Sequence, residues 1–364
     1  EGQSVADRAV CINNYCLRTR QQIASVLTTD DRDVRITSQY YHLPLPLLAY
    51  RCYCRSGEVT MRQGEPIEFP IEEEYKKSHG VTAEDVTLLR RWLQTQPHLP
   101  EQYITDLDLV LAYHSCNRST EVTKQLIDLN YTLRTSITDY FQARNDDGDL
   151  QRILNNFLIL PLPGRSNDGN AILYSQLINI DVTAFSCTDL VKGLLLILDV
   201  WQYEEGTWPG LELVVNFSNY SLGHIARIDI RNIQLFACYF QEAIPLQLKR
   251  IHLISAPSYI DKLLALAKPF LSNQLRDNLH VYKDGVTALE KFMPAHSFPK
   301  DVGGDYKTVN ECKDDVLKKL QASASFFVAE SKKRVSEELR PVEQRRGREH
   351  EHLSYGSFKK LDID

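Results

Sequence analysis

The sequence lacks most of the features that mark a membrane-spanning, secreted or nucleotide-binding protein. No uninterrupted apolar run approaches the roughly 20 residues that a transmembrane helix needs. The first residues, EGQSVADRAV, contain no charged and then apolar leader, so nothing in them predicts secretion. Neither GxGxxG nor GxxxxGK[ST] occurs, so no motif predicts nucleotide binding. With a net charge of −6, the chain gives no reason to expect nucleic acid as a partner.

Cysteine supplies little support for a metal site. Cys11, Cys16, Cys52 and Cys54 lie in the first sixty residues and could together provide four zinc ligands. The Cys-x-Cys pair is closer than the usual zinc spacing, however, and no histidine pair accompanies it. We therefore expect no metal and no other cofactor. The remaining cysteines are scattered singly, which is typical of buried apolar positions in a reducing compartment.

What is present is the composition of a globular protein. The chain has 364 residues, 43% of them hydrophobic, which is enough for two modest domains. Residues 1–60 have no sustained period and are predicted to be an irregular extension outside the native fold, with Met61 as an alternative natural start. Residues 61–148 are predicted to form a small all-α domain, 149–306 an α/β domain, and 307–364 a charged, helix-prone C-terminal tail.

Capping signals locate the helices of the all-α domain. Thr82 precedes two acidic residues and the pattern VTLLRRWLQTQ, so it is predicted to cap a helix that ends before Pro97. Ser119 is predicted to cap a later helix, TEVTKQLIDLNYTLRTSITDYF. Between them, Leu107 to Tyr113 suggest one more helix.

Strands and helices alternate after residue 149. FLIL at Phe157–Leu160 is predicted to be a strand that PLPG breaks, and AILYSQLINI, LELVVNF and RIHLIS are predicted to be further strands. One of the intervening helices is expected from about His224 to Gln241. Strands separated by helices predict a mostly parallel sheet.

Ser221 and His224 follow the strand LELVVNF at a polar turn, where α/β enzymes often carry catalytic groups. No GxSxG elbow is present, so Ser221 lacks the strained turn that exposes a nucleophile. At the start of a helix, Ser221 is better explained as an N-cap. Asp229 would point to another helix face and could not orient His224. We predict no catalytic residue and no enzyme.

Three predicted helices, within residues 190–201, 228–240 and 259–271, are more apolar than a simple core needs. One interpretation is that they cover a parallel sheet on one side and other helices on the other. The second interpretation is that they line a cavity for a lipid. Composition alone leaves both open.

The segment IPLQLKRIHLISAPSYIDKLLALAKPFL, followed by HVY and FPKDVGGDY, resembles the CRAL-TRIO lipid-binding family. That family includes tocopherol-transfer, retinaldehyde-binding and phosphatidylinositol-transfer proteins. Pro245, Pro257 and Gly303-Gly304 match its pattern, LLRRWLQTQPHL resembles its preceding helical domain, and GSFKKLDID resembles the end of insect-like members. The resemblance implies a CRAL-TRIO cage: a mostly parallel sheet and flanking helices around an apolar cavity, preceded by a small all-α domain.

The resemblance also implies non-enzymatic binding and transfer of one small apolar lipid, such as a tocopherol, a retinoid or another terpenoid. An amphipathic gate helix is expected at Tyr259–Ala267. Tyr239 is expected to hydrogen-bond a ligand hydroxyl or carbonyl. The residues that matching segments predict to line the cavity are Leu190, Leu194, Ile197, Leu213, Val215, Phe236, Tyr239, Phe240, Leu246, Ile251, Ile260 and Leu263.

Two departures from the family pattern concern polar residues. Asn216 and Asn219 stand where many members have Asp-x-x-Gly. Where the tocopherol branch has basic residues that hold phosphoinositide headgroups, this chain has Gln247, Gln274 and Asn278. The residues predicted to contact anionic membrane lipids are the nearby Lys249, Arg250, Lys268 and Arg276.

The expected location is the cytoplasm, with transient contact to a membrane surface. Three alternatives stay open: a phospholipid or phosphoinositide transfer protein, a protein-interaction module whose cavity is filled by side chains, and a hydrolase that uses Ser221 and His224.

Overall fold

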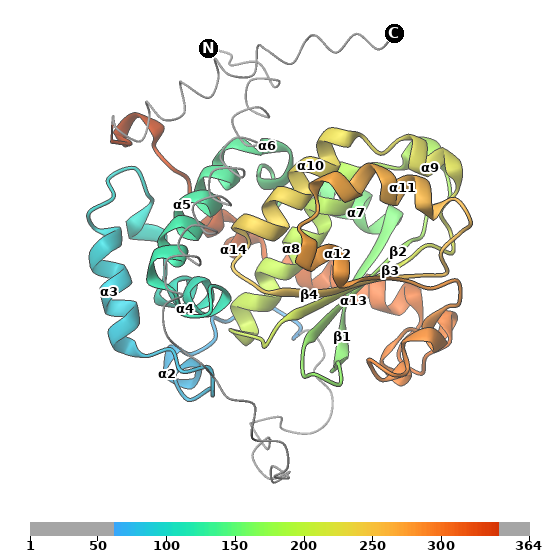
Figure 1. The fold of residues 1–364 in the computed structure, drawn as a ribbon, viewed down its shortest axis with the longest axis horizontal. Helices are drawn as coiled ribbons and strands as arrows, with labels where there is room; N and C mark the ends of the chain where they lie inside the picture. Colours follow the sequence, from blue (N-terminus) through green and yellow to red (C-terminus); the bar gives the residue numbers. More distant parts are fainter. Residues whose placement is uncertain (1–61, 342–364) are drawn as a thin grey trace, which may run out of the picture.

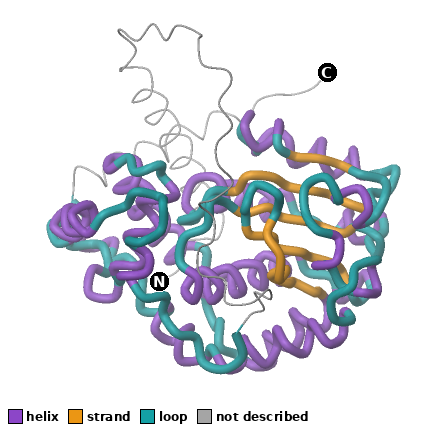
Figure 2. The backbone as a smooth tube through the Cα atoms, turned by 90° about the horizontal axis from the view of Figure 1, so that it is seen from below, coloured by secondary structure: helices purple, strands orange, loops and turns teal. Residues whose placement is uncertain are grey.

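The structure, a computed structural model, describes residues 62–341 (Figure 1). The predicted extension 1–60, with its paired cysteines, and the GSFKKLDID terminus lie outside the described residues. Within the described chain, a helical unit precedes a unit of alternating strands and helices. The strands lie together on one side of the molecule and the first helices lie on the other (Figure 2). The predicted α/β fold class is confirmed.

Two helices of the helical unit begin at capping boxes, whereas Ser119, the predicted cap of α5, is its N-cap residue but makes no side-chain capping bond. The hydroxyl of Thr82 accepts a hydrogen bond from the backbone N–H of Asp85, whose carboxylate accepts one from the N–H of Thr82. Thr105 and Asp108 repeat this capping box at the next helix. The helices are α2 (Ile71–Glu74), α3 (Ala83–Leu93), α4 (Asp106–Ser115), α5 (Thr120–Ser136), α6 (Thr138–Phe141) and α7 (Asp147–Asn156).

The second unit is built on a five-stranded sheet with the order β1-β2-β3-β4-β5. Only the β1–β2 pair is antiparallel in this sheet, which agrees with the prediction of a mostly parallel sheet. β1 continues past the predicted break at Pro161 to Arg165, with an irregular register. An edge strand tolerates proline because the missing N–H need not pair. The strands are β1 (Phe157–Arg165), β2 (Ala171–Leu177), β3 (Leu211–Asn216), β4 (Leu248–Ile254) and β5 (Leu279–Val281).

The connections between parallel strands cross one face of the sheet. Neighbouring strands follow one another in sequence, and such crossovers are right-handed, so each lies on the same face. The packing is close: a Cβ at Gly193 would lie 2.5 Å from Cδ1 of Ile159 on β1. The crossing elements are α8 (Cys187–Glu205), α9 (Leu222–Ala226), α10 (Ile230–Cys238), a π-helical turn (Tyr239–Ala243), α11 (Ile260–Ala267) and α12 (Asn273–Asp277).

The helix expected from about His224 to Gln241 is interrupted, which corrects the prediction. α9 ends at Ala226, and α10 begins at Ile230 after the N-cap residue Asp229. The carboxylate of Asp229 accepts a hydrogen bond from the N–H of Arg231 at 3.1 Å. Aspartate favours caps over helix interiors because its side chain competes for backbone N–H groups. The apolar residues on both sides follow one helical period, so the pattern conceals the break.

The first part of the predicted charged tail is folded against the rest of the molecule. α13 (Val309–Ala322) packs against β1 and α7, and α14 (Ala324–Glu330) follows it. Lys319 of α13 has no exposed side-chain surface, and its ammonium lies 2.6 Å from the carboxylate of Glu204 on α8. A buried charge is tolerated when it is paired. The start of the predicted helix-prone tail is thus helical, but it packs against the rest of the molecule, and residues 342–364 lie outside the described chain.

Candidate functional site

Two rows of apolar side chains cross the sheet on the face that the crossing helices cover. Leu173, Leu213 and Ile251 lie in register on β2, β3 and β4, and the row continues to β5. Side chains two residues further along a strand point to the same face, so Val215 and Leu253 belong to a second row. We call this the apolar face of the sheet.

The twelve residues that sequence segments predict to line a cavity all belong to one apolar cluster. They come from β3, β4, α8, α10, the π turn and α11, and from the loop before β4. The structure therefore brings together residues that are up to 73 positions apart in sequence, from Leu190 to Leu263. That a ligand contacts them stays a prediction. The buried members are Leu194, Ile197, Leu213, Tyr239, Phe240, Ile251 and Ile260, and the half-buried members are Leu190, Val215, Phe236, Leu246 and Leu263.

The predicted gate helix is α11, which starts one residue later than expected. Its Ile260 and Leu264 are buried toward the cluster, one turn apart. Leu266 on the other side of the helix leaves 42% of its surface exposed. α11 packs against α10 and continues into a short 3₁₀ turn, Lys268–Phe270. A short amphipathic helix with an exposed leucine therefore forms the outer layer over the apolar face.

A polar cavity of about 210 Å³ opens where the helical unit meets the end of the π turn. We call it the mouth cavity. Phe240 and Leu246 of the predicted set line it, together with Leu248 and Leu275. Its polar lining includes Ser115, Asn117, Gln247, Lys249, Ser272 and Gln274.

Hydrogen bonds between the two units organise the mouth cavity. The amide nitrogen of Gln247 donates to Oδ1 of Asn117 at 3.0 Å and to the carbonyl of His114 at 3.3 Å. The ammonium of Lys249 donates to Oε1 of Gln247. Burial lowers the pKa of Lys249. Asn117 and Arg118 both have left-handed backbone (φ 50° and 65°), so the turn that carries Asn117 holds local strain.

The four basic residues predicted to contact anionic lipids do not share one role. Lys249 lines the mouth cavity, whereas its neighbour Arg250 points to the opposite face of the sheet. There the guanidinium of Arg250 lies 2.6 Å from Asp168 and 2.9 Å from Glu212. Lys268 and Arg276 are exposed near α11 and α12. Contact of any of them with a membrane stays a prediction.

Tyr239, the predicted hydrogen-bonding partner of a ligand, has a partner within the protein. The amide of Asn130 on α5 donates to the Tyr239 hydroxyl oxygen at 3.1 Å. Tyr239 is 1% exposed, and its ring lies 5.3 Å from the ring of Phe141. Burial raises the pKa of Tyr239, so the phenol stays protonated at neutral pH. The helical unit thus orients the Tyr239 side chain, and a hydrogen bond from Tyr239 to a ligand stays a prediction.

The other face of the sheet carries a buried polar cluster. Glu212 is fully buried, and its carboxylate accepts hydrogen bonds from Asn170 at 2.8 Å, from Arg250 at 2.9 Å and from His252 at 2.9 Å. Burial alone would raise the pKa of Glu212, but the bonds from His252 and Asn170 and the charge of Arg250 lower it to about 2. We call this the polar face.

Residues after β5 cover the polar face. The ring of Phe292 lies 5.0 Å from that of His252, and the ring of Phe298 lies 5.6 Å from that of Tyr174. The Gly303-Gly304 pair is needed here, because Gly303 has φ 98° and a Cβ at Gly304 would lie 2.1 Å from the Phe298 carbonyl. Aromatic rings rather than helices therefore close this side.

Ser221 and His224 form a helix cap, as the sequence predicts. Nδ1 of His224 accepts a hydrogen bond from the backbone N–H of Ser221 at 2.9 Å and lies 2.9 Å from its hydroxyl.

The departure from the family pattern at Asn216 and Asn219 has a local structural reason. Asn216 donates to the Tyr174 hydroxyl and accepts from the N–H of Ser218, and Asn219 donates to the carbonyl of Leu177.

The contribution of the helical unit to this region is absent from the residues predicted from the sequence. Ser115 and Asn117 at the end of α4 line the mouth cavity, and Asn130 on α5 holds Tyr239. The partners are more than 100 positions apart, so no local pattern marks them. The available signal was an asparagine next to the apolar positions Leu126, Leu129 and Leu133 of α5.

These features define an α/β fold with one apolar and one polar sheet face, closed on the apolar side by an amphipathic helix. Residues 156–304 match the CRAL/TRIO domain family, and residues 79–149 match the family described as "Pinta-like, UBA domain". The chain therefore contains a domain of the CRAL-TRIO family, whose members typically bind or transfer lipids, and the resemblance read from the sequence is confirmed.

Named relatives support this assignment. The chain is 26% identical over 180 residues to Clavesin-1 of Rattus norvegicus, covering 46% of this chain and 51% of that protein. It is 21% identical over 274 residues to "Alpha-tocopherol transfer protein-like" of Mus musculus, covering 75% and 73% of the two chains. The match thus spans only about half the length of the Clavesin-1 relative.

Among solved structures, the one described as "Crystal structure of Sfh5" aligns with 64% of this chain and 92% of that chain, at 12% identity and a TM-score of 0.37. Within residues 62–341, none of the helices has the length and apolar character that crossing a membrane would require.

Proposed function

We propose that this protein is a non-enzymatic carrier that binds one small apolar lipid, such as a tocopherol, a retinoid or another terpenoid. The observation that carries the proposal is the apolar face of the sheet beneath apolar helices, with amphipathic α11 as the outer layer. The ligand would lie between this face and the helices, and α11 would act as the gate. The relative named after alpha-tocopherol transfer fits this ligand class.

Physical chemistry explains why such a lipid needs a carrier. Each CH₂ group exposed to water costs roughly 0.8 kcal/mol, so a ligand of about twenty carbons costs on the order of 15 kcal/mol to carry bare through water. A closed apolar cavity removes most of this cost. The proposal includes a cytoplasmic location and transient contact with a membrane surface, where Leu266 and the cations near α11 would meet lipid.

The mouth cavity supports a ligand with a small, uncharged polar end. Its lining offers amide and hydroxyl groups from Asn117, Gln247 and Ser272, and a single cation, Lys249. Lys249 already donates to Gln247, and burial favours its neutral form. A phosphoinositide headgroup carries several charges and would need several cations. The lining therefore favours a hydroxyl or carbonyl over a polyphosphate, and phospholipid transfer is the weaker alternative.

Lipid extraction of the purified protein, followed by mass spectrometry, tests the proposal. We expect one terpenoid-class molecule per protein. Phospholipid as the main species would favour the phospholipid-transfer alternative. Recovery of no lipid, together with failure to bind an added fluorescent terpenoid, would favour a protein-interaction module with a filled interior. Ester hydrolysis that is lost in Ser221→Ala would indicate an enzyme instead.

A further inference from the structure

The π-helical turn at the end of α10 is held at both ends by one side chain of the helical unit. The amide of Asn130 donates to the hydroxyl oxygen of Tyr239 at 3.1 Å and to the carbonyl oxygen of Ala243 at 2.8 Å. Tyr239 and Ala243 are the first and last residues of the turn, and all three residues are buried. π-helical turns are rare and are frequent at functional sites. Asn130 therefore fixes a turn that few sequences adopt.

The same turn is bonded on its other side to the end of the gate region. The amide nitrogen of Gln241 donates to the carbonyl of Phe270 at 2.9 Å, and its Oε1 accepts from the N–H of Ser272 at 2.6 Å. Phe270 and Ser272 directly follow α11. The π turn thus lies between α5 of the helical unit and the segment that follows α11, with two hydrogen bonds to each.

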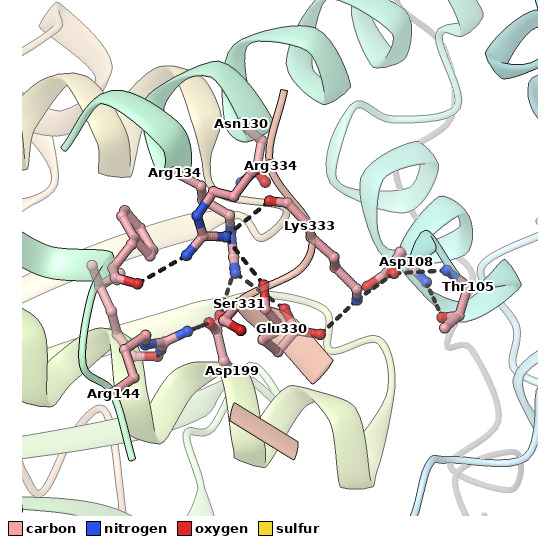
Figure 3. A network of polar contacts seen from close by, with 12 residues as sticks. Thr105, Asp108, Asn130, Arg134, Arg144, Asp199, Glu330, Ser331, Lys333 and Arg334 are labelled. Atoms are coloured by element: carbon pink, nitrogen blue, oxygen red, sulfur yellow. Dashed lines mark hydrogen bonds and ion pairs between the residues drawn. The ribbon is translucent and has the colours of Figure 1, made fainter. Parts of the chain in front are cut away.

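A buried ion network holds α5 in position, one turn beyond Asn130. Arg134 is 6% exposed, and its guanidinium lies 2.8 Å from Asp199 on α8 and 3.1 Å from Glu330 on α14. Arg144 approaches the other oxygen of Asp199 at 2.7 Å. Figure 3 shows Arg134 pointing between Asp199 and Glu330. α5 is therefore fixed to a helix of the cage and to the C-terminal segment.

Residues after α14 close this network on the helical unit. Lys333 lies 2.6 Å from Glu330 and 2.6 Å from Asp108 at the start of α4. Arg334 donates to the carbonyl of Phe141 at 2.8 Å (Figure 3). Lys333 is 7% exposed, so little solvent weakens these pairs. Residues 330–340 thus connect the two units, and we call this segment the strap. We call its contacts, together with those of Asn130 and Arg134, the joint between the units.

We infer that this joint is a brace that controls the mobility of the gate: Asn130 holds the π turn, and Gln241 passes the restraint to the end of α11. Loosening the joint frees α10 and α11 while the sheet stays fixed. The use of this mobility for lipid exchange rests on the proposed function, but the coupling itself is a property of the protein alone. Through this joint, the helical unit then regulates the mobility of the cage.

Amide hydrogen exchange on the lipid-free full chain, followed by mass spectrometry, tests the brace. In Asn130→Ala, we expect about tenfold faster exchange in peptides that cover residues 230–247 and 260–272, because two buried hydrogen bonds are lost. Peptides from β3 and β4 should keep their rates. The control is Val86→Ala, a core truncation in α3 within an apolar cluster that does not include the π turn, which should leave both peptides unchanged.

A second pair of variants tests the path through Gln241. In the Gln241→Ala background, adding Asn130→Ala should still accelerate residues 230–247 but should no longer change residues 260–272. If Asn130→Ala does not fold, Tyr239→Phe serves in its place, with about threefold faster exchange expected from the loss of one bond. Equal acceleration in Val86→Ala, or acceleration that never reaches residues 260–272, would overturn the inference. Because no ligand is present, these outcomes are independent of any lipid result.

Discussion

The two faces of the sheet differ in the kind of contact that their strand residues make. On the apolar face, Leu213 and Ile251 meet helices through contacts that have no preferred direction. On the polar face, Glu212 accepts hydrogen bonds from three groups whose geometry is fixed. Contacts of the first kind can be exchanged for contacts with another apolar molecule. Contacts of the second kind are lost outright when the partners separate.

For the proposed lipid carrier, this comparison predicts opening on the apolar side. A lipid that entered over the apolar face would replace side-chain contacts by equivalent ones. Opening the polar face would instead remove the rings of Phe292 and Phe298 and admit water to the buried cluster of Glu212 and His252. We therefore expect the sheet and the covering residues 286–306 to act as the fixed half, and the crossing helices as the half that moves.

The largest expected effect comes from breaking the polar face. Glu212→Ala removes the acceptor of Asn170, Arg250 and His252, and should lower the free energy of unfolding by about 3 kcal/mol. Urea denaturation measures this change. Glu72→Ala removes an exposed carboxylate and should change stability by no more than about 0.5 kcal/mol. A loss below about 1 kcal/mol in Glu212→Ala would mean that the polar face is not the rigid half.

The same carboxylate predicts how stability depends on pH. The pKa of Glu212 is lowered to about 2, so its contribution is fully present above the unfolded pKa of about 4.3 and is lost as the pH falls through about 2. Glu74 and Asp128 also have pKa values of about 2, so they add to this loss. Urea midpoints at pH 7, 4 and 3 should therefore fall less steeply in Glu212→Gln than in the unmodified chain. If the urea midpoints of the two proteins fell equally with pH, the lowered pKa would not belong to Glu212.

Adjacent residues of β3 allow a direct comparison of the two faces. Leu213→Phe adds volume on the apolar face, and Val214→Phe adds it on the polar face. We expect Leu213→Phe to weaken binding of a fluorescent terpenoid about tenfold, because it takes space that the ligand uses. Val214→Phe should lower stability by about 1–3 kcal/mol through overpacking but leave the affinity of the folded protein unchanged. Equal affinities for the two variants would place the ligand elsewhere.

The smallest expected effect concerns the mouth cavity. Gln274→Lys adds a cation at its edge, where an anionic headgroup would lie. One lysine near an anionic surface contributes about 1 kcal/mol, so binding to phosphoinositide-containing vesicles should rise about fivefold. Gln94→Lys adds the same charge at an exposed position of the helical unit and should give no such rise. Sedimentation with vesicles measures both, and equal gains would show only an effect of net charge.

The sequence predicts best the parts of the fold that rest on local patterns and family motifs. The cap at Thr82, the strand from Leu211 and the amphipathic helix after Tyr259 all follow from residues within one turn or one strand. The break at Asp229 was missed because the apolar period continues across it. The extent of β1 was missed because a proline is excluded only from strands whose N–H groups pair.

The joint between the two units could not be predicted from the sequence. Asn130 and Tyr239 are 109 positions apart, and Arg134 and Glu330 are 196 apart. The run of charges after residue 307 has the composition of a solvated tail, and only the folded chain shows that Lys319 and Arg340 are buried. Composition gives the number of charges in a segment. Whether those charges are buried depends on oppositely charged residues in elements that are distant in sequence.

The position of this strap near the end of the described chain also bears on how the protein is made. Ribosomes release the N-terminal unit first, and domains tend to fold as they emerge. Arg340, whose guanidinium lies 2.8 Å from Asp128 on α5, emerges roughly two hundred residues after its partner. The helical unit and the cage must therefore exist for a time without the strap that joins them. The ion pairs of the strap form once residues 330–340 have been translated.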